Sequence, residues 1–136
     1  MIRNFLLGGS MEKKLVYRPL AVHSDDEIKR ILSEGTLEEI TLLPLEVGMN
    51  HHNWKFAQDV CLKLAEHENE AIRANAVLGL AYIARTKGKL SYHLVKPVIF
   101  RELRRSENFK WRIEDAICDI NIFLDQHTKY SHLLLI

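Results

Sequence analysis

The residues of this chain that could carry acid–base or metal chemistry are its histidines, two cysteines and a few carboxylates. The candidates are His51, His52, His93, His127, His132, Cys61 and Cys118. A metal site needs a recurring ligand spacing, such as paired cysteines or two histidines one helical turn apart. Neither spacing occurs, and the His51-His52 pair falls in a polar turn where we expect both rings to be solvated. The sequence therefore predicts no metal site, no cofactor and no catalytic residue.

One enzyme alternative stays open. Tyr92 and His93 lie in one helical segment and Asp115 and Asp119 in another, so a pocket would form if the two segments converged. Such a pocket would suit a helical-repeat lyase or another small-molecule enzyme. The sequence lacks a glycine-rich phosphate loop and a nucleophile elbow, so this alternative depends on those four side chains alone.

Charge is distributed unevenly along the chain, although the net charge is only +1. Residues 24–46 carry seven acidic side chains against two basic ones, whereas residues 85–112 carry nine basic side chains against two acidic ones. Two separated regions of opposite charge produce electrostatic potentials that steer encounters with charged partners. We predict an acidic partner-binding surface made of Asp25, Asp26, Glu27, Glu34, Glu38, Glu39 and Glu46. The alternative is a phosphate-binding surface made of Lys96, Arg101, Arg104 and Arg105.

The elements that must position these groups are all predicted to be helices. Capping-box patterns at 24–27 and 36–39 predict helices that end at Gly35 and Gly48, with Pro44 bending the second. Apolar residues at three- and four-residue steps predict further helices beginning near Asn53, Asn69, Leu90 and Asn108. No segment has the pattern of a strand. About six helices with short connections indicate an all-α fold of antiparallel neighbours.

A six-residue sequence motif, called the repeated phrase below, occurs twice in the second half of the chain. Glu68-Asn69-Glu70-Ala71-Ile72-Arg73 returns 39 residues later as Glu107-Asn108-Phe109-Lys110-Trp111-Arg112. This spacing and pattern resemble HEAT and armadillo repeats, which are built from stacked helix pairs. Residues 69–105 resemble one unit, 108–126 the first helix of the next, and 36–66 a degenerate earlier pair. A third partial copy at Trp54-Lys55 lies only 18 residues before Ile72-Arg73 and does not fit that period.

The resemblance implies a small α-solenoid of stacked antiparallel helix pairs, and a compact helical bundle is the alternative. It also implies structural roles for Arg73 and Arg112, which would link adjacent turns, and packing roles for Trp54 and Trp111. We expect residues 1–10 to be a disordered leader or a start codon called too early, and residues 11–136 to form a single domain. Whether Leu133–Ile136 packs back or forms an interface stays open.

Composition and size favour a cytoplasmic helical module. The chain has 136 residues, 47% hydrophobic and 27% charged, and no apolar run long enough to span a membrane. Stacked helix pairs usually bind another polypeptide. Such small modules resemble some bacterial immunity proteins, which neutralise a cognate toxin by covering its active site. That resemblance implies an acidic surface that imitates nucleic acid, whereas a HEAT-like nucleic-acid-binding protein would use the basic stretch 85–112.

Overall fold

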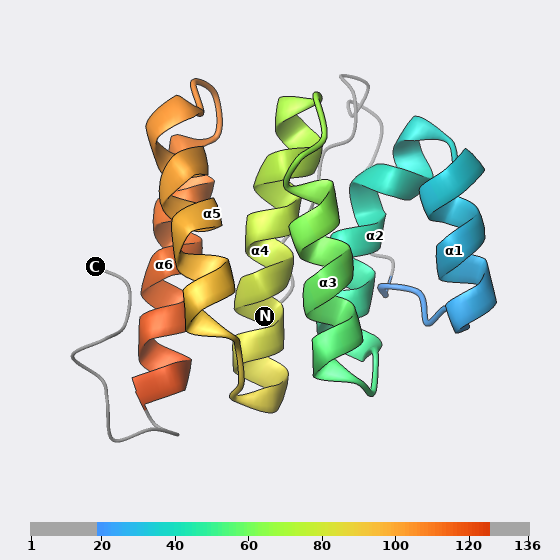
Figure 1. Cartoon of the computed structure of the whole chain (residues 1–136), viewed down its shortest axis with the longest axis horizontal. Helices are drawn as coiled ribbons and strands as arrows, with labels where there is room; N and C mark the ends of the chain where they lie inside the picture. The colour runs from blue at the N-terminus through green and yellow to red at the C-terminus, as the bar shows by residue number, and fades with distance from the viewer. Residues whose placement is uncertain (1–18, 126–136) are drawn as a thin grey trace.

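The computed structural model describes residues 19–125 and contains six α-helices over that range, with no strand (Figure 1). The helices are α1 (Asp25–Glu34), α2 (Leu37–Asn50), α3 (Trp54–Leu64), α4 (Glu70–Lys87), α5 (Tyr92–Arg105) and α6 (Lys110–Asp125). The predicted all-α class and helix number are confirmed. The expectations for residues 1–10, for His127 and His132 and for Leu133–Ile136 lie outside the described residues.

The helices form two layers. The most extensive contacts join α2 to α4 and α4 to α6, so these three make one layer with α4 in the centre. In the second layer, α3 covers α2 and α4 while α5 covers α6 and touches α4, as Figure 1 shows. The first helix, α1, packs on α2 at one end. Neighbouring pairs therefore stack side by side, which agrees with the predicted arrangement of antiparallel helix pairs.

Capping side chains fix most of the predicted helix starts. Thr36 and Glu39 form the complete capping box at the start of α2. Asn53 and Asn69 cap α3 and α4, since each side-chain oxygen accepts two backbone N–H groups of the first turn. Gly35 ends α1 as predicted. The turns that the sequence marked with Ser, Thr and Asn are thus real helix boundaries.

Gly48 does not end α2, which contradicts the prediction, because the helix continues to Asn50. The residue serves a different purpose. A Cβ atom built at Gly48 would lie 2.5 Å from the Gly79 carbonyl oxygen, and one built at Gly79 would lie 2.5 Å from the Pro44 carbonyl oxygen. The two glycines therefore let the backbones of α2 and α4 approach each other more closely than any side chain allows.

The core follows the central helix α4. Ile72, Val77, Leu80 and Ile83 are almost completely buried, and alanines between them keep the helix surface shallow, as expected for the middle of a stack. Each fully buried aliphatic side chain contributes roughly 1.5–3 kcal/mol. The stripe of α6 that faces α4 includes Ile113 and Ile120, which are also buried. Apolar contact between neighbouring helices is therefore the main force that holds the stack.

Polar contacts also join successive copies of the repeated phrase. The Glu70 carboxylate at the start of α4 accepts the backbone N–H groups of Glu107 and Asn108, the Asn108 side-chain amide and the Ser106 hydroxyl. These donors hold the pKa of Glu70 at about 2, below its ordinary value of 4.5. The start of α4 is thus hydrogen-bonded directly to the turn that precedes α6.

The repeated arginines have structural roles, as the resemblance implied. Arg73 donates from Nε to both Glu102 carboxylate oxygens at 3.0 Å and from Nη1 to two carbonyl oxygens of the turn before α4. Arg112 donates to Asn75 on α4, whose amide in turn donates to the Thr41 carbonyl oxygen on α2. This second chain of contacts crosses the whole layer from α6 to α2.

The tryptophans differ from each other. Trp54 is half-buried against the core, in agreement with the packing prediction. The same prediction is wrong for Trp111, which is 52% exposed, with the Arg112 guanidinium 5.3 Å from the centre of its ring. Trp54 also begins α3, in the other layer from α4 and α6, so the third copy of the phrase is not a repeat in the structural sense.

Candidate functional site

The predicted acidic surface lies on α1 and α2 at one end of the stack. Asp25, Asp26, Glu27 and Glu34 belong to α1, and Glu38, Glu39 and Glu46 belong to α2. The most exposed of the set include Asp26, Glu34 and Glu38, which have no ion-pair or hydrogen-bond partner within residues 19–125. Leu37 lies between the last two in sequence and is 60% exposed. Three free carboxylates and one apolar side chain therefore face solvent in this region.

Arg30 ties two of the other carboxylates together. Its Nη2 donates to Glu27 Oε2 and to Glu39 Oε2, each at 2.8 Å. These hydrogen bonds from Arg30 lower the pKa values of both Glu27 and Glu39, and the Thr36 backbone N–H further lowers that of Glu39. These ion pairs fix α1 against the first turn of α2. Glu27 and Glu39 therefore have a structural role in addition to their negative charge.

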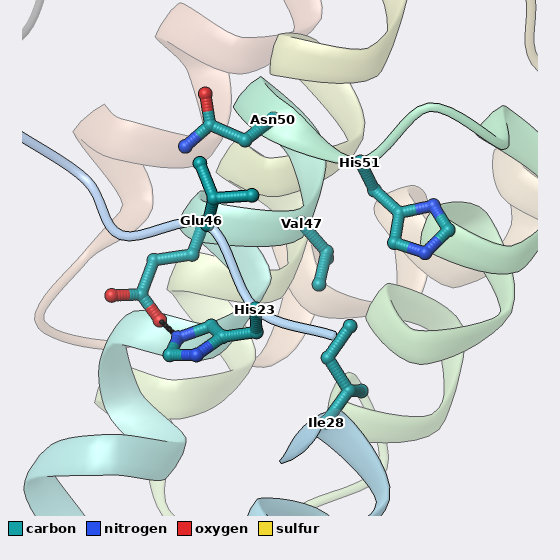
Figure 2. Close-up of a pocket in the computed structure, with 7 residues that line it drawn as sticks. His23, Ile28, Glu46, Val47, Asn50 and His51 are labelled. Atoms are coloured by element: carbon teal, nitrogen blue, oxygen red, sulfur yellow. Dashed lines mark hydrogen bonds and ion pairs between the residues drawn. The ribbon is translucent and has the colours of Figure 1, made fainter. Parts of the chain in front are cut away.

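Glu46 lies below the surface. It is only 8% exposed and hydrogen-bonds to His23, with 2.7 Å between the imidazole Nε2 and Glu46 Oε1 (Figure 2). The sequence reasoning did not single out His23, because a contact across 23 residues leaves no local pattern. Nearby, the Asn50 amide donates to the carbonyl oxygens of Leu20 and Ala21. The last turn of α2 thus holds the segment that leads into α1.

His51 is buried, which contradicts the expectation of a solvated histidine pair. Its Nε2 lies 2.8 Å from Asp25 Oδ1, and its Nδ1 accepts the Asn53 backbone N–H at 3.0 Å. The hydrogen bond from His51 is the main cause of the lowered pKa of Asp25. The ring also stacks between Phe56 and His52, with ring centres 4.7 Å apart on each side. Only His52 is exposed, as expected of both.

Two hollows adjoin these residues. A void of about 10 Å³, lined by His23, Ile28, Glu46 and Val47 among others, has room for about one water molecule (Figure 2). An open cavity of about 470 Å³ lies next to it. Its lining consists of Val22, His23, Ser24, Asp25, Asp26, Asn50, His51 and His52. This cavity combines carboxylates, imidazoles and the first turn of a helix.

The alternative basic surface is partly neutralised. Arg101 forms an ion pair with Glu66 at 2.6 Å, and Arg105 pairs with the buried Glu102 at 2.8 Å. Arg104 is exposed and Lys96 half-buried. Both lack an ion-pair partner in the part of the chain that the structure describes. Two free cations on α5 make a weaker phosphate site than the four that the sequence suggested.

The residues of the enzyme alternative do not share either hollow. His93 and Asp115 are exposed, and Asp119 lies 3.8 Å from Arg85 of α4. Among residues 19–125, no cluster of histidine, cysteine or acidic side chains has the geometry to hold a metal ion. Burial raises the pKa of the Cys61 thiol, so its reactive thiolate form is suppressed. No helix in the described range is long and apolar enough to cross a membrane.

Comparison with known proteins gives a likeness in fold. No protein-family model matches the sequence, and no curated protein matches it. The structure is similar to a chain in the crystal structure of a CDI complex from Cupriavidus taiwanensis LMG 19424. The TM-score is 0.70 at 21% sequence identity, and the match covers 81% of this chain and 98% of that chain. At this identity the likeness concerns the fold.

Proposed function

We propose that this chain is a cytoplasmic bacterial immunity protein, which neutralises a cognate toxin by binding it and covering its active site, without catalysis of its own. The observation that carries the proposal is the likeness to a chain of a CDI complex, a toxin–immunity system of contact-dependent inhibition. The match spans nearly the whole of that chain, so it concerns the fold of one component of that complex.

The charge on α1 and α2 supports a partner with a basic surface. Asp26, Glu34 and Glu38 are exposed, and the Arg30 network holds the supporting carboxylates in place. A nuclease toxin binds nucleic acid phosphates through basic residues, so a rigid acidic surface can occupy that site in their place. Leu37 adds an exposed apolar side chain beside these carboxylates, and its burial against a partner would remove apolar surface from water.

A HEAT-like repeat is part of the same proposal. The Glu70 carboxylate of one copy of the phrase accepts the backbone N–H groups of Glu107 and Asn108 in the next copy, and this direct contact between the two copies supports a structural repeat. Stacks of this kind offer extended, preformed surfaces to protein partners.

The proposal is tested by capturing the partner and measuring neutralisation. The chain is used to capture proteins from its native cell lysate under a high-salt wash, and the stoichiometric partner is then expressed in a host with and without the chain. We expect the partner to stop growth alone and to be tolerated when this chain is present. Recovery of nucleic acid in place of a protein, or a partner whose toxicity the chain does not relieve, would overturn the proposal.

Matched variants locate the surface. Reversing two free charges with Glu34→Lys and Glu38→Lys should weaken toxin binding by about tenfold or more. Glu114→Lys reverses another exposed charge, on α6 at the opposite end of the described stack, and should leave binding unchanged. If both changes weaken binding equally, the acidic surface is not the toxin-binding surface. The immunity function would then still be decided by the neutralisation assay.

A further inference from the structure

Three aromatic rings form a column beside the open cavity. Phe56, in the first turn of α3, stacks on His51 at an interplanar angle of 23°, and His51 stacks on His52 at 17°. Hydrogen bonds on both nitrogens of His51 fix the middle ring: the Asn53 backbone N–H at one and the Asp25 carboxylate at the other. The column is therefore preorganised, and it ends in His52, an exposed ring that lines the cavity.

Two carboxylates lie at the same cavity. Asp25 and Asp26 open α1, and both line the hollow of about 470 Å³ next to His52. Because His51 lowers the pKa of Asp25, this carboxylate remains ionised well below neutral pH. His51 occupies Asp25 Oδ1, and no contact within residues 19–125 occupies Asp26. The cavity thus offers negative charge beside a flat ring.

We infer that this cleft binds the guanidinium group of an arginine side chain on the protein partner. A guanidinium is planar, stacks on an aromatic face and presents its N–H groups in a fork that suits carboxylates. The open face of His52 supplies the stacking surface, and Asp25 and Asp26 supply acceptors. A lysine ammonium has the same charge but neither the plane nor the fork, so the site distinguishes the two.

The positive end of the α1 dipole opposes a cation at this place, by about half an elementary charge. Asp25 and Asp26 together supply two full negative charges in the same turn, and Lys29, one turn further along α1, offsets one of them, so the local balance stays negative and favours a cation. The cavity is also larger than a single arginine side chain, which leaves room for the guanidinium group to enter from solvent. That a partner protein supplies the arginine rests on the proposed function; the guanidinium site itself does not.

The test is an NMR titration of the isolated protein with two capped peptides, acetyl-Gly-Arg-Gly-amide and acetyl-Gly-Lys-Gly-amide. We expect the arginine peptide to shift the amide signals of residues 22–26 and 50–52 with a dissociation constant on the order of millimolar. Asp26→Asn and His52→Ala should each weaken this binding by about three- to fivefold, whereas Glu34→Gln on the far end of α1 should not. The two cleft variants change exposed side chains, so loss of the fold does not obscure the result.

Absence of shifts at residues 22–26 and 50–52 would overturn the inference. Equal binding of the lysine peptide, or equal loss with Glu34→Gln, would also overturn it, because either result indicates general charge attraction. The titration needs no toxin. Its failure therefore leaves the neutralisation test of the immunity function untouched, and failure to neutralise a toxin leaves the titration result standing.

Discussion

Replacing Gly79 with alanine should destabilise the protein although it stabilises the helix that contains it. The new Cβ would lie 2.5 Å from the Pro44 carbonyl oxygen and 2.8 Å from Cys61 Sγ. The first neighbour is backbone of α2, the helix that has the most extensive contact with α4. Relief of the contact therefore requires the two helices to move apart.

Two opposing effects set the size of the change. Overpacking a core of this kind costs about 1–3 kcal/mol. Alanine gains about 1 kcal/mol over glycine in helix propensity. Since the clash involves backbone and a buried sulfur, we expect the upper part of the first range and a net loss of about 1–2 kcal/mol. For a domain of this size the melting temperature should fall by about 3–8 °C.

The measurement is urea and thermal unfolding followed by far-UV circular dichroism, with the peptide 70–87 as a control. The same substitution in the isolated peptide should raise its helix content, because no second helix is present. Gly48→Ala should act like Gly79→Ala, since its Cβ would lie 2.5 Å from the Gly79 carbonyl oxygen, and the double variant should cost less than the sum. A Gly79→Ala protein as stable as the wild type would refute the close-approach argument.

Three further changes test other contacts. Glu70→Gln should cost about 1–2 kcal/mol at neutral pH, because it weakens charge-assisted hydrogen bonds at a half-exposed site. The pKa of Glu70 falls from 4.5 to about 2 on folding. The stability that the Glu70 carboxylate supplies is therefore present above pH 4.5 and is lost as the pH falls toward 2. The variant should therefore show a flatter acid unfolding curve than the wild type, and identical curves would contradict the assigned contacts. Glu102→Ala removes a buried carboxylate and leaves the half-buried Arg73 side chain with only its two carbonyl acceptors, so it should cost about 3 kcal/mol in urea unfolding. A loss below about 1 kcal/mol would argue against a stabilising pair. Leu80→Asp places a charge at a fully buried position and should abolish folding, so a soluble, fully helical variant would tell against the stack.

The helices could be predicted from the sequence because their signals are local. Asn, Ser and Thr at helix starts and apolar residues at helical spacing act within one or two turns, and the structure confirms them. Gly48 shows the limit. Glycine ends helices and also permits close helix crossings, and the sequence does not state which backbone lies opposite. Trp111 was wrongly placed for a similar reason, since its helix lies at the end of the layer, where one face lacks a neighbour among the described helices.

The candidate site was only partly predictable. The acidic residues were visible as a charge run, and the pairing of Glu27 with Arg30, three residues apart, follows from helix geometry. The contacts of His23 with Glu46 and of His51 with Asp25 span 23 and 26 residues, so they depend on how α1 folds back over α2. Burial of His51 and formation of the ring column follow from the same fold and could not be expected from a polar turn alone.

The central place of α4 has a consequence for synthesis on the ribosome. The helices α1, α2 and α3 leave the exit tunnel first, yet the main packing surface of α2 faces α4. At about 5–20 residues per second, the nascent chain spends on the order of seconds with that surface uncovered. Stable folding therefore waits until residues 70–87 have emerged, and a chaperone that binds nascent apolar segments would act on α2 during that interval.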